Sequence, residues 1–226
     1  MPWARLLSEG AGIVAGILIA LAADAWWDGQ VERRDEQMAL RELQEEFHDN
    51  AVQLDSVLSY HATGQRAVDV LLSFSRGHVE LSADSVRRLI WVLDNPWTYN
   101  PKSGALDALI ASGRLGIIRD RVLRAELAGW AGLVEDYREE EEHSREYAMG
   151  PQYAYFSSVL NWGTVYRVES EPAPASILRL ADDPGFESVV AYRSSFLDGV
   201  LTEAQYVAEA LARIQELLSA SLSAGG

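Results

Sequence analysis

An apolar stretch near the start of the chain constrains the fold of this sequence more than any other feature. Residues 8–30 read SEGAGIVAGILIALAADAWWDGQ, and no charged residue interrupts the run from Ala11 to Ala23. Arg5, this run and its Ala-x-Ala triplets match the outline of a secretory signal peptide. However, Glu9 stands where the apolar core of a signal peptide should begin. We therefore expect the segment to be retained as a membrane helix.

The length of this segment has to be reconciled with the thickness of a bilayer. Its uncharged run is shorter than the roughly 20 residues that a membrane span needs. A helix from Trp3 to Trp27 supplies the missing length. Tryptophan is enriched at both membrane–water interfaces, and a terminal arginine can extend its charge to the headgroups. The sequence thus predicts a transmembrane anchor at residues 1–29, with Trp3, Arg5, Trp26 and Trp27 at the interfaces.

The small residues of the predicted anchor share one face. At about 100° per residue, a narrow stripe contains Gly12, Gly16, Ala20 and Ala23. Small residues at this spacing let the backbones of neighbouring membrane helices approach closely. Glu9 continues the stripe one turn earlier, so we expect these five residues to form a helix-packing interface. Alternatively, Glu9 lies at headgroup depth and caps the N-terminus of the helix, where an acidic side chain is favourable.

The charge balance excludes several classes of partner and ligand. The 226 residues include 34 acids against 19 lysines and arginines, for a net charge of −15, and Lys102 is the only lysine. Such a chain lacks the basic surface that nucleic acid requires. It is equally unsuited to peripheral docking on anionic lipid. Because the chain has no cysteine, it has neither disulfides nor Cys-ligated metals, and we predict no cofactor.

Helical periodicity dominates the rest of the sequence. From Val31 to about Ser75, apolar residues recur at helical spacing and no proline intervenes. The members of this stripe are Leu40, Leu43, Phe47, Ala51, Leu54 and Leu58. A second stripe follows Asp120 and contains Leu123, Leu127, Trp130, Val134 and Tyr137. The fragment GRLGII is the only candidate strand, and it is too short to build a sheet.

Capping residues predict where the remaining helices begin and end. A short helix is expected at about 82–93, before the helix-breaking DNPWTYNP. Ser103 and Gly113 can cap the next one, and Asp183 with Pro184 opens the last. We therefore predict an all-α fold of three long and two short helices. In it, the transmembrane helix continues into an antiparallel bundle, and residues 30–226 form an acidic helical domain.

Two segments of the chain resemble an uncharacterised bacterial family of single-pass membrane proteins, a domain of unknown function. The first is EGAGIVAGILIALAADAWWD, which is similar to the family's E-G-x-x-x-x-G-I-L-I-A-L type of helix followed by Trp. The second is SGALDALIASGRLGIIRDRVLRAELAGW, and the similarity covers about residues 8–150. The Trp–Trp–Asp sequence departs from the Asn-Trp-Asn pattern of the family. The resemblance implies the membrane topology only, because the family has no assigned activity.

A pair of Glu-x-x-His motifs is the sharpest candidate for chemistry. Glu45 with His48, and Glu140 with His143, have the spacing that carboxylate-bridged di-iron bundles use. Both motifs lie a quarter-turn or more off the apolar stripes, whereas such ligands must converge inside the bundle. We therefore predict no metal site, and we expect the acidic run YREEEEHSREY to be a solvent-exposed helix face.

No constellation of residues predicts catalysis. His61 and His78 are isolated, and the chain has neither a nucleophile elbow nor a phosphate loop. Trp91, Trp97 and Tyr99 cluster around two prolines and are a candidate docking surface. Alternatively, they cap one end of the bundle.

These patterns favour a non-catalytic function. We expect a scaffold or accessory subunit in a larger complex of the bacterial inner membrane, for example a respiratory or photosynthetic one. Its partners would be lipid and other membrane helices. The distribution of arginines leans slightly toward a cytoplasmic helical domain. The alternative is a homo-oligomeric channel or sensor in which Glu9 lines the helix seam.

Overall fold

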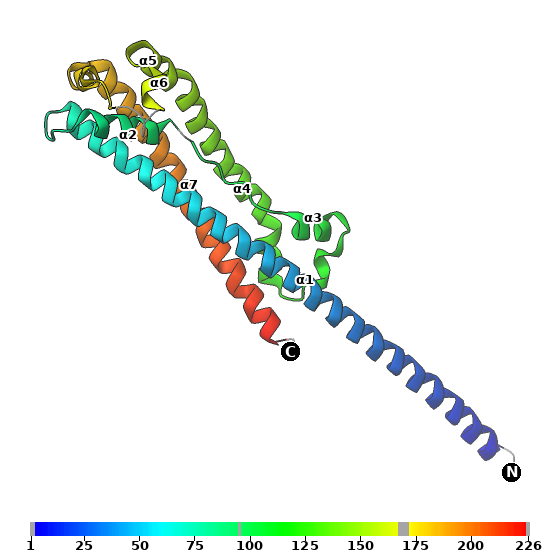
Figure 1. Cartoon of the computed structure of the whole chain (residues 1–226). Helices are drawn as coiled ribbons and strands as arrows, with labels where there is room; N and C mark the ends of the chain where they lie inside the picture. The colour runs from blue at the N-terminus through cyan, green and yellow to red at the C-terminus, as the bar shows by residue number, and fades with distance from the viewer. Residues whose placement is uncertain (1–2, 95, 167–171, 225–226) are drawn as a thin grey trace. The chain divides into compact units, whose positions relative to one another are not determined.

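The computed structural model describes residues 3–94, 96–166 and 172–224, with side chains from Gly16 onward. The regular elements of this part of the chain are all helices and it has no strand, which confirms the all-α prediction. The long helices are α1 (Trp3–Ser75), α4 (Arg121–Tyr147) and α7 (Pro184–Ala224). The short ones are α2 (Ala83–Leu93), α3 (Gly104–Ala111), α5 (Tyr153–Val159) and α6 (Trp162–Val165). Figure 1 shows the order of these elements along the chain.

Three helix boundaries lie where the capping residues predict them. The Asp120 carboxylate accepts the N–H groups of Val122 and Leu123 at 2.7 and 3.0 Å, ahead of α4. Asp183 accepts the Gly185 N–H at 2.8 Å at the start of α7. Gly113 follows α3 with a φ of 68°, a left-handed conformation that favours glycine. These capping residues therefore predict the three helix boundaries correctly.

The start of α3 is capped differently from the prediction. The Ser103 side chain makes no cap hydrogen bond and donates instead to the Asp107 carboxylate at 2.6 Å. The free N–H groups of Ala105 and Leu106 donate to Glu46 of α1, at 2.7 and 3.2 Å. A carboxylate is the stronger acceptor at a helix N-terminus, so the more distant residue displaces the local one. The GRLGII fragment contains a 3₁₀ turn, Arg114–Ile117, and no strand.

The chain divides into two compact units, and α1 contributes to both. The first comprises Met1–Glu46, Ser103–Ala125 and Gln215–Gly226. Its buried apolar side chains are Ala39, Leu40, Leu43, Leu106, Ile118, Leu123 and Leu218. Glu36 ties the stretch between the 3₁₀ turn and α4 to α1, because it accepts the Arg119 N–H at 2.7 Å. The predicted boundary between residues 29 and 30 stays a prediction.

The second unit, Phe47–Lys102 with Glu126–Ile214, is a bundle of α1, α4 and α7 (Figure 1). Helix α7 runs antiparallel to α1, as the bonds Gln65–Ser194 and Arg76–Glu187 show. It also runs antiparallel to α4, through Glu126–Arg213 and Tyr147–Val189. In contrast, α1 and α4 run parallel, since Phe47 meets Trp130 and His61 meets Glu141.

The predicted all-antiparallel bundle is therefore wrong for the α1–α4 pair. The chain between α1 and α4 contains α2, α3 and an extended stretch. This connection is long enough to run back alongside α1, so that α4 can start in the same direction as α1. A short loop would have forced the two helices to run antiparallel.

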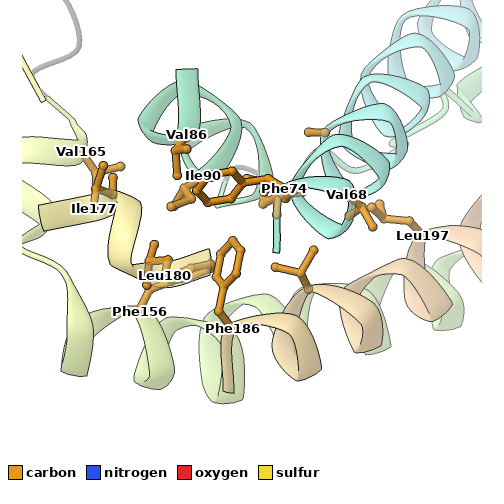
Figure 2. Close-up of a cluster of buried hydrophobic side chains, with 14 residues drawn as sticks. Val68, Phe74, Val86, Ile90, Phe156, Val165, Ile177, Leu180, Phe186 and Leu197 are labelled. Atoms are coloured by element: carbon orange, nitrogen blue, oxygen red, sulfur yellow. The ribbon is translucent and has the colours of Figure 1, made fainter. Parts of the chain in front are cut away.

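An apolar core closes the second unit at the end where α2, α5 and α6 lie (Figure 2). Phe156 and Phe186 pack with ring centroids 6.3 Å apart, surrounded by aliphatic side chains. These include Val68, Leu71, Val86, Ile90, Val165, Ile177, Leu180 and Leu197. The stripe predicted on α4 is buried from Leu123 to Tyr137, which confirms that face as its core side.

The predicted membrane span lies at the N-terminal end of α1. Within the part of the chain that is described, no helix combines the length and the apolar character that crossing a membrane requires. Helix α1 includes the predicted span, but the side chains of Trp3, Arg5 and Glu9, and the surroundings of Gly12, lie outside the described residues.

Candidate functional site: a buried polar layer and an adjoining groove

The inward face of α4 changes from apolar to polar along its length. Leu127, Trp130 and Val134 come first, and the next buried residues are Tyr137, Glu141 and Ser144. The last three share a face because they are spaced by four and three residues. A polar layer thus crosses the middle of the bundle, beside the apolar core.

Glu141 is the centre of this layer, with only 3% of its surface exposed. Both of its carboxylate oxygens accept the backbone N–H of Tyr99 at 3.0 Å. Tyr99 belongs to the irregular stretch 96–102, which we call the connecting segment. His61 of α1 lies against this carboxylate, with its Nε2 3.6 Å from Oε1. That distance is too long for a hydrogen bond.

Two tyrosines enclose the carboxylate. The rings of Tyr99 and Tyr137 meet edge to face, with centroids 6.1 Å apart. Burial raises the pKa of both hydroxyls, and the nearby charge of Glu141 raises each pKa further. Within the described residues, neither hydroxyl makes a hydrogen bond of ordinary length and angle. Both phenols are therefore neutral at physiological pH.

A buried arginine extends the layer toward α7. Arg193 is 3% exposed, and its Nη1 donates to the carbonyl and the hydroxyl of Ser144 at 2.9 and 2.6 Å. Burial lowers the pKa of Arg193 to about 10, against the attraction of Tyr147, Asp94 and Tyr60. The guanidinium stays charged at neutral pH, so it supplies a positive charge inside the bundle.

Hydrogen bonds to α1 and α4 hold the connecting segment in place. The side chain of Asn50 bonds both backbone groups of Lys102, at 2.8 and 2.7 Å. Just before the segment, Gln152 donates to the Leu93 carbonyl at 3.1 Å. The Tyr166 hydroxyl donates to Asp94, and burial raises the pKa of this carboxyl. The buried polar side chains thus act chiefly as backbone clamps.

A groove of about 560 Å³ opens where the connecting segment crosses α1. Asp49, Gln53 and Ser56 of α1 line one side of it, and Trp97 and Lys102 line the other. Trp97 is half exposed and stacks on Tyr60, with ring centroids 5.0 Å apart. The groove therefore combines an aromatic wall with an acid, a base, an amide and a hydroxyl, which suits binding.

The chemistry of the layer is that of support and binding. Glu141 and His61 are enclosed, and both carboxylate oxygens are already engaged by the Tyr99 N–H. A general base needs access to a substrate proton, which this arrangement does not give. In the described part of the chain, no group of three His, Asp or Glu side chains has the geometry of a metal site.

The structure separates the residues of the candidate docking surface. Trp91 and Trp97 are 38% and 47% exposed, whereas Tyr99 is buried against Tyr137. Tyr99 therefore belongs to the interior of the bundle, where its backbone N–H donates a hydrogen bond to Glu141.

The other predicted sites are on the surface. Glu45, His48 and His143 are exposed, and Glu140 is half-buried. On α1, the small residues Gly16, Ala20 and Ala23 are exposed, as are Trp26 and Trp27.

Glu141 is the residue that the sequence interpretation missed. It lies in the run YREEEEHSREY, which is expected to face solvent, and that expectation is wrong at Glu141, Ser144 and Tyr147, which are buried. The Tyr99 N–H donates to both oxygens of the buried Glu141 carboxylate. The signal was its spacing: Glu141 follows Val134 by seven residues and Tyr137 by four, which places it on the buried stripe.

Comparison with family models, curated proteins and solved structures found no match.

Proposed function

We propose that this chain is a non-catalytic scaffold that is anchored in the bacterial inner membrane by the N-terminal part of α1. Its acidic helical domain docks a partner, and the protein acts as an accessory subunit of a larger complex. Lipid and the helices of other membrane proteins surround the anchor.

One observation carries this proposal: an apolar length of α1 is left exposed by the part of the chain that the structure describes. Ile17, Leu18, Ile19 and Leu21 are 55–70% exposed, and Trp26 and Trp27 are 64% and 60% exposed. Successive helix residues point about 100° apart, so the apolar side chains surround the helix instead of forming one stripe. A helix that is apolar all round belongs in a core or in a membrane.

The surroundings of this length favour helix packing. Gly16 has nothing within 4 Å of the position where a Cβ would stand, and Ala20 and Ala23 share its face. A neighbouring helix can therefore approach the backbone closely along this line.

The anchor is tested by placing charges on it. Full-length wild type, expressed in a bacterium, is expected in the membrane fraction and to resist extraction by alkaline carbonate. Each acidic residue in the centre of a membrane helix costs about 2.5–3.5 kcal/mol of insertion free energy. The double variant Leu18→Glu with Leu21→Glu should therefore move to the soluble fraction.

The matched control adds the same charge elsewhere. Gln205→Glu with Tyr206→Glu alters two exposed positions of α7 and should leave the chain in the membrane fraction. Wild type that is soluble, or that carbonate releases, would contradict the anchor.

The scaffold role is tested by purification in mild detergent with mass spectrometry of what accompanies the chain. A stable set of other membrane proteins is expected, and Gly12→Leu with Gly16→Ile should release it. A complex of this chain alone would favour the homo-oligomeric channel or sensor, in which Glu9 lines the seam. Survival of the complex in the Gly12 and Gly16 variant would contradict the small-residue interface.

A further inference from the structure

The groove beside the connecting segment has the features of a binding site for a positively charged, planar group. Its aromatic wall is Trp97, which is 47% exposed and rests against Tyr60 at an interplanar angle of 22°. The stacking holds the indole in one position, so a ligand need not immobilise it. An indole face is the strongest of the aromatic acceptors for a cation.

The acid of the groove is already paired with a cation. The Asp49 carboxylate accepts Lys102 Nζ at 2.6 Å, and this contact lowers the pKa of Asp49. The two side chains are 52% and 67% exposed. An ion pair as exposed as this one is weak, because water screens it and both side chains lose conformational freedom. A second cation can therefore replace Lys102 at small cost.

The walls on either side of this ion pair are rigid. Asn50 holds the backbone of Lys102 by two hydrogen bonds, and Glu141 holds Tyr99. The lysine side chain can swing away while the backbone that carries it stays in place. The groove is thus preorganised, and only its one flexible cation has to move.

We propose that this groove docks an arginine-bearing, basic peptide segment of the partner protein. The guanidinium stacks on Trp97 and takes the place of Lys102 on the Asp49 carboxylate. Arginine suits both contacts, because its planar group stacks on aromatic rings and bonds carboxylates through two donors. Charge complementarity supports a basic partner, since the chain has a net charge of −15. The inference rests on the proposed scaffold function and names its docking surface.

A defined probe tests the inference on the full-length chain in mild detergent. The probe is an acetylated and amidated pentapeptide of alternating glycine and arginine, titrated by isothermal calorimetry. A glutamate version of the same peptide is the control ligand. Trp97→Ala and Asp49→Asn should each weaken binding of the arginine peptide about threefold to tenfold.

Lys102→Gln is the most discriminating variant, because it is expected to gain affinity for the arginine peptide. Removing the competing ammonium frees Asp49, so this variant should bind the arginine peptide several-fold more tightly than wild type. Misfolding cannot produce such a gain. Asn50 bonds only the backbone of residue 102, so the wall of the groove stays intact in the variant.

Two control variants separate the groove from general charge and from aromatic surface. Asp198→Asn removes an exposed acid of α7, and Trp91→Ala removes an exposed indole of α2; neither should change binding. Equal loss in Asp198→Asn and Asp49→Asn would overturn the inference, as would weaker binding by Lys102→Gln or preference for the glutamate peptide. Membrane attachment is independent of these variants, so loss of attachment contradicts the anchor alone.

Discussion

Glu141 offers the most informative perturbation of this protein, because two substitutions separate its two roles. Glu141→Leu removes both the acceptor of the Tyr99 N–H and the charge that faces His61. Glu141→Gln keeps one oxygen that can accept the Tyr99 N–H, while it removes the charge and exchanges the other oxygen for an amide NH2. If the carboxylate acts mainly as a backbone clamp, the leucine variant should lose much more stability than the glutamine variant.

The expected magnitudes follow from the contacts. A buried N–H left without an acceptor costs about 1–3 kcal/mol. His61 lies 3.6 Å from the carboxylate without a hydrogen bond, so its loss of contact adds no second hydrogen-bond term. We expect Glu141→Leu to lower the free energy of unfolding by about 3 kcal/mol and Glu141→Gln, which keeps an acceptor oxygen, by about 1 kcal/mol.

Two measurements on the full-length chain in mild detergent test this expectation. Urea unfolding, followed by circular dichroism, gives the loss of stability. Hydrogen exchange gives the local effect, since the amide of Tyr99 should exchange at least about tenfold faster in the leucine variant. Glu142→Gln is the matched control, because Glu142 is exposed and its ion pair is with Arg145 on the surface, so neither measurement should change.

Each role has its own contrary result. Equal destabilisation by leucine and glutamine would show that the charge matters and the acceptor does not. A leucine variant with unchanged stability and unchanged exchange at Tyr99 would refute the clamp altogether.

Three further substitutions test other parts of the structure. Gly64→Ala should raise the free energy of unfolding by about 0.5–1 kcal/mol, because the new methyl meets Leu197 at an ordinary 3.5 Å within a helix. Gly113→Ala should lower it by about 1 kcal/mol, since φ there is 68°; urea unfolding measures both. Asp94→Asn should raise the melting temperature at pH 7, because burial raises the pKa of Asp94 above 3.8. The carboxyl contributes stability below that value and loses it as pH rises through its folded pKa, so the gain should vanish below pH 3.8.

The helix boundaries and the buried faces were predictable because they depend on neighbours in the sequence. Asp120 and Asp183 bond N–H groups two or three residues later, and such contacts form whatever the rest of the chain does. The stripe from Leu123 to Tyr137 is likewise a local pattern. Pattern alone therefore identified the all-α fold and the core side of α4.

Long-range polar contacts account for what the sequence interpretation missed. The cap of α3 comes from Glu46, far away along the chain, and no local rule ranks that residue above Ser103. Tyr99 was expected on a docking surface with Trp91 and Trp97, but its N–H is drawn inward by Glu141. Only Trp97 of this cluster lies in the groove. Among the acidic residues of its run, Glu141 alone is fully buried, and composition does not distinguish it from its neighbours.

The polar layer also explains how the bundle selects the direction of its helices. Apolar stripes on α1 and α4 are nearly non-directional, so burial alone does not distinguish a parallel pair from an antiparallel one. The clamps are directional: Asn50 must meet Lys102 and Glu141 must meet Tyr99, so the connecting segment has to lie against both helices. Antiparallel α1 and α4 would separate Asn50 from Glu141 along the bundle, so that one connecting segment could not reach both side chains. The buried polar contacts therefore favour the parallel pair, whereas the apolar side chains supply most of the stability.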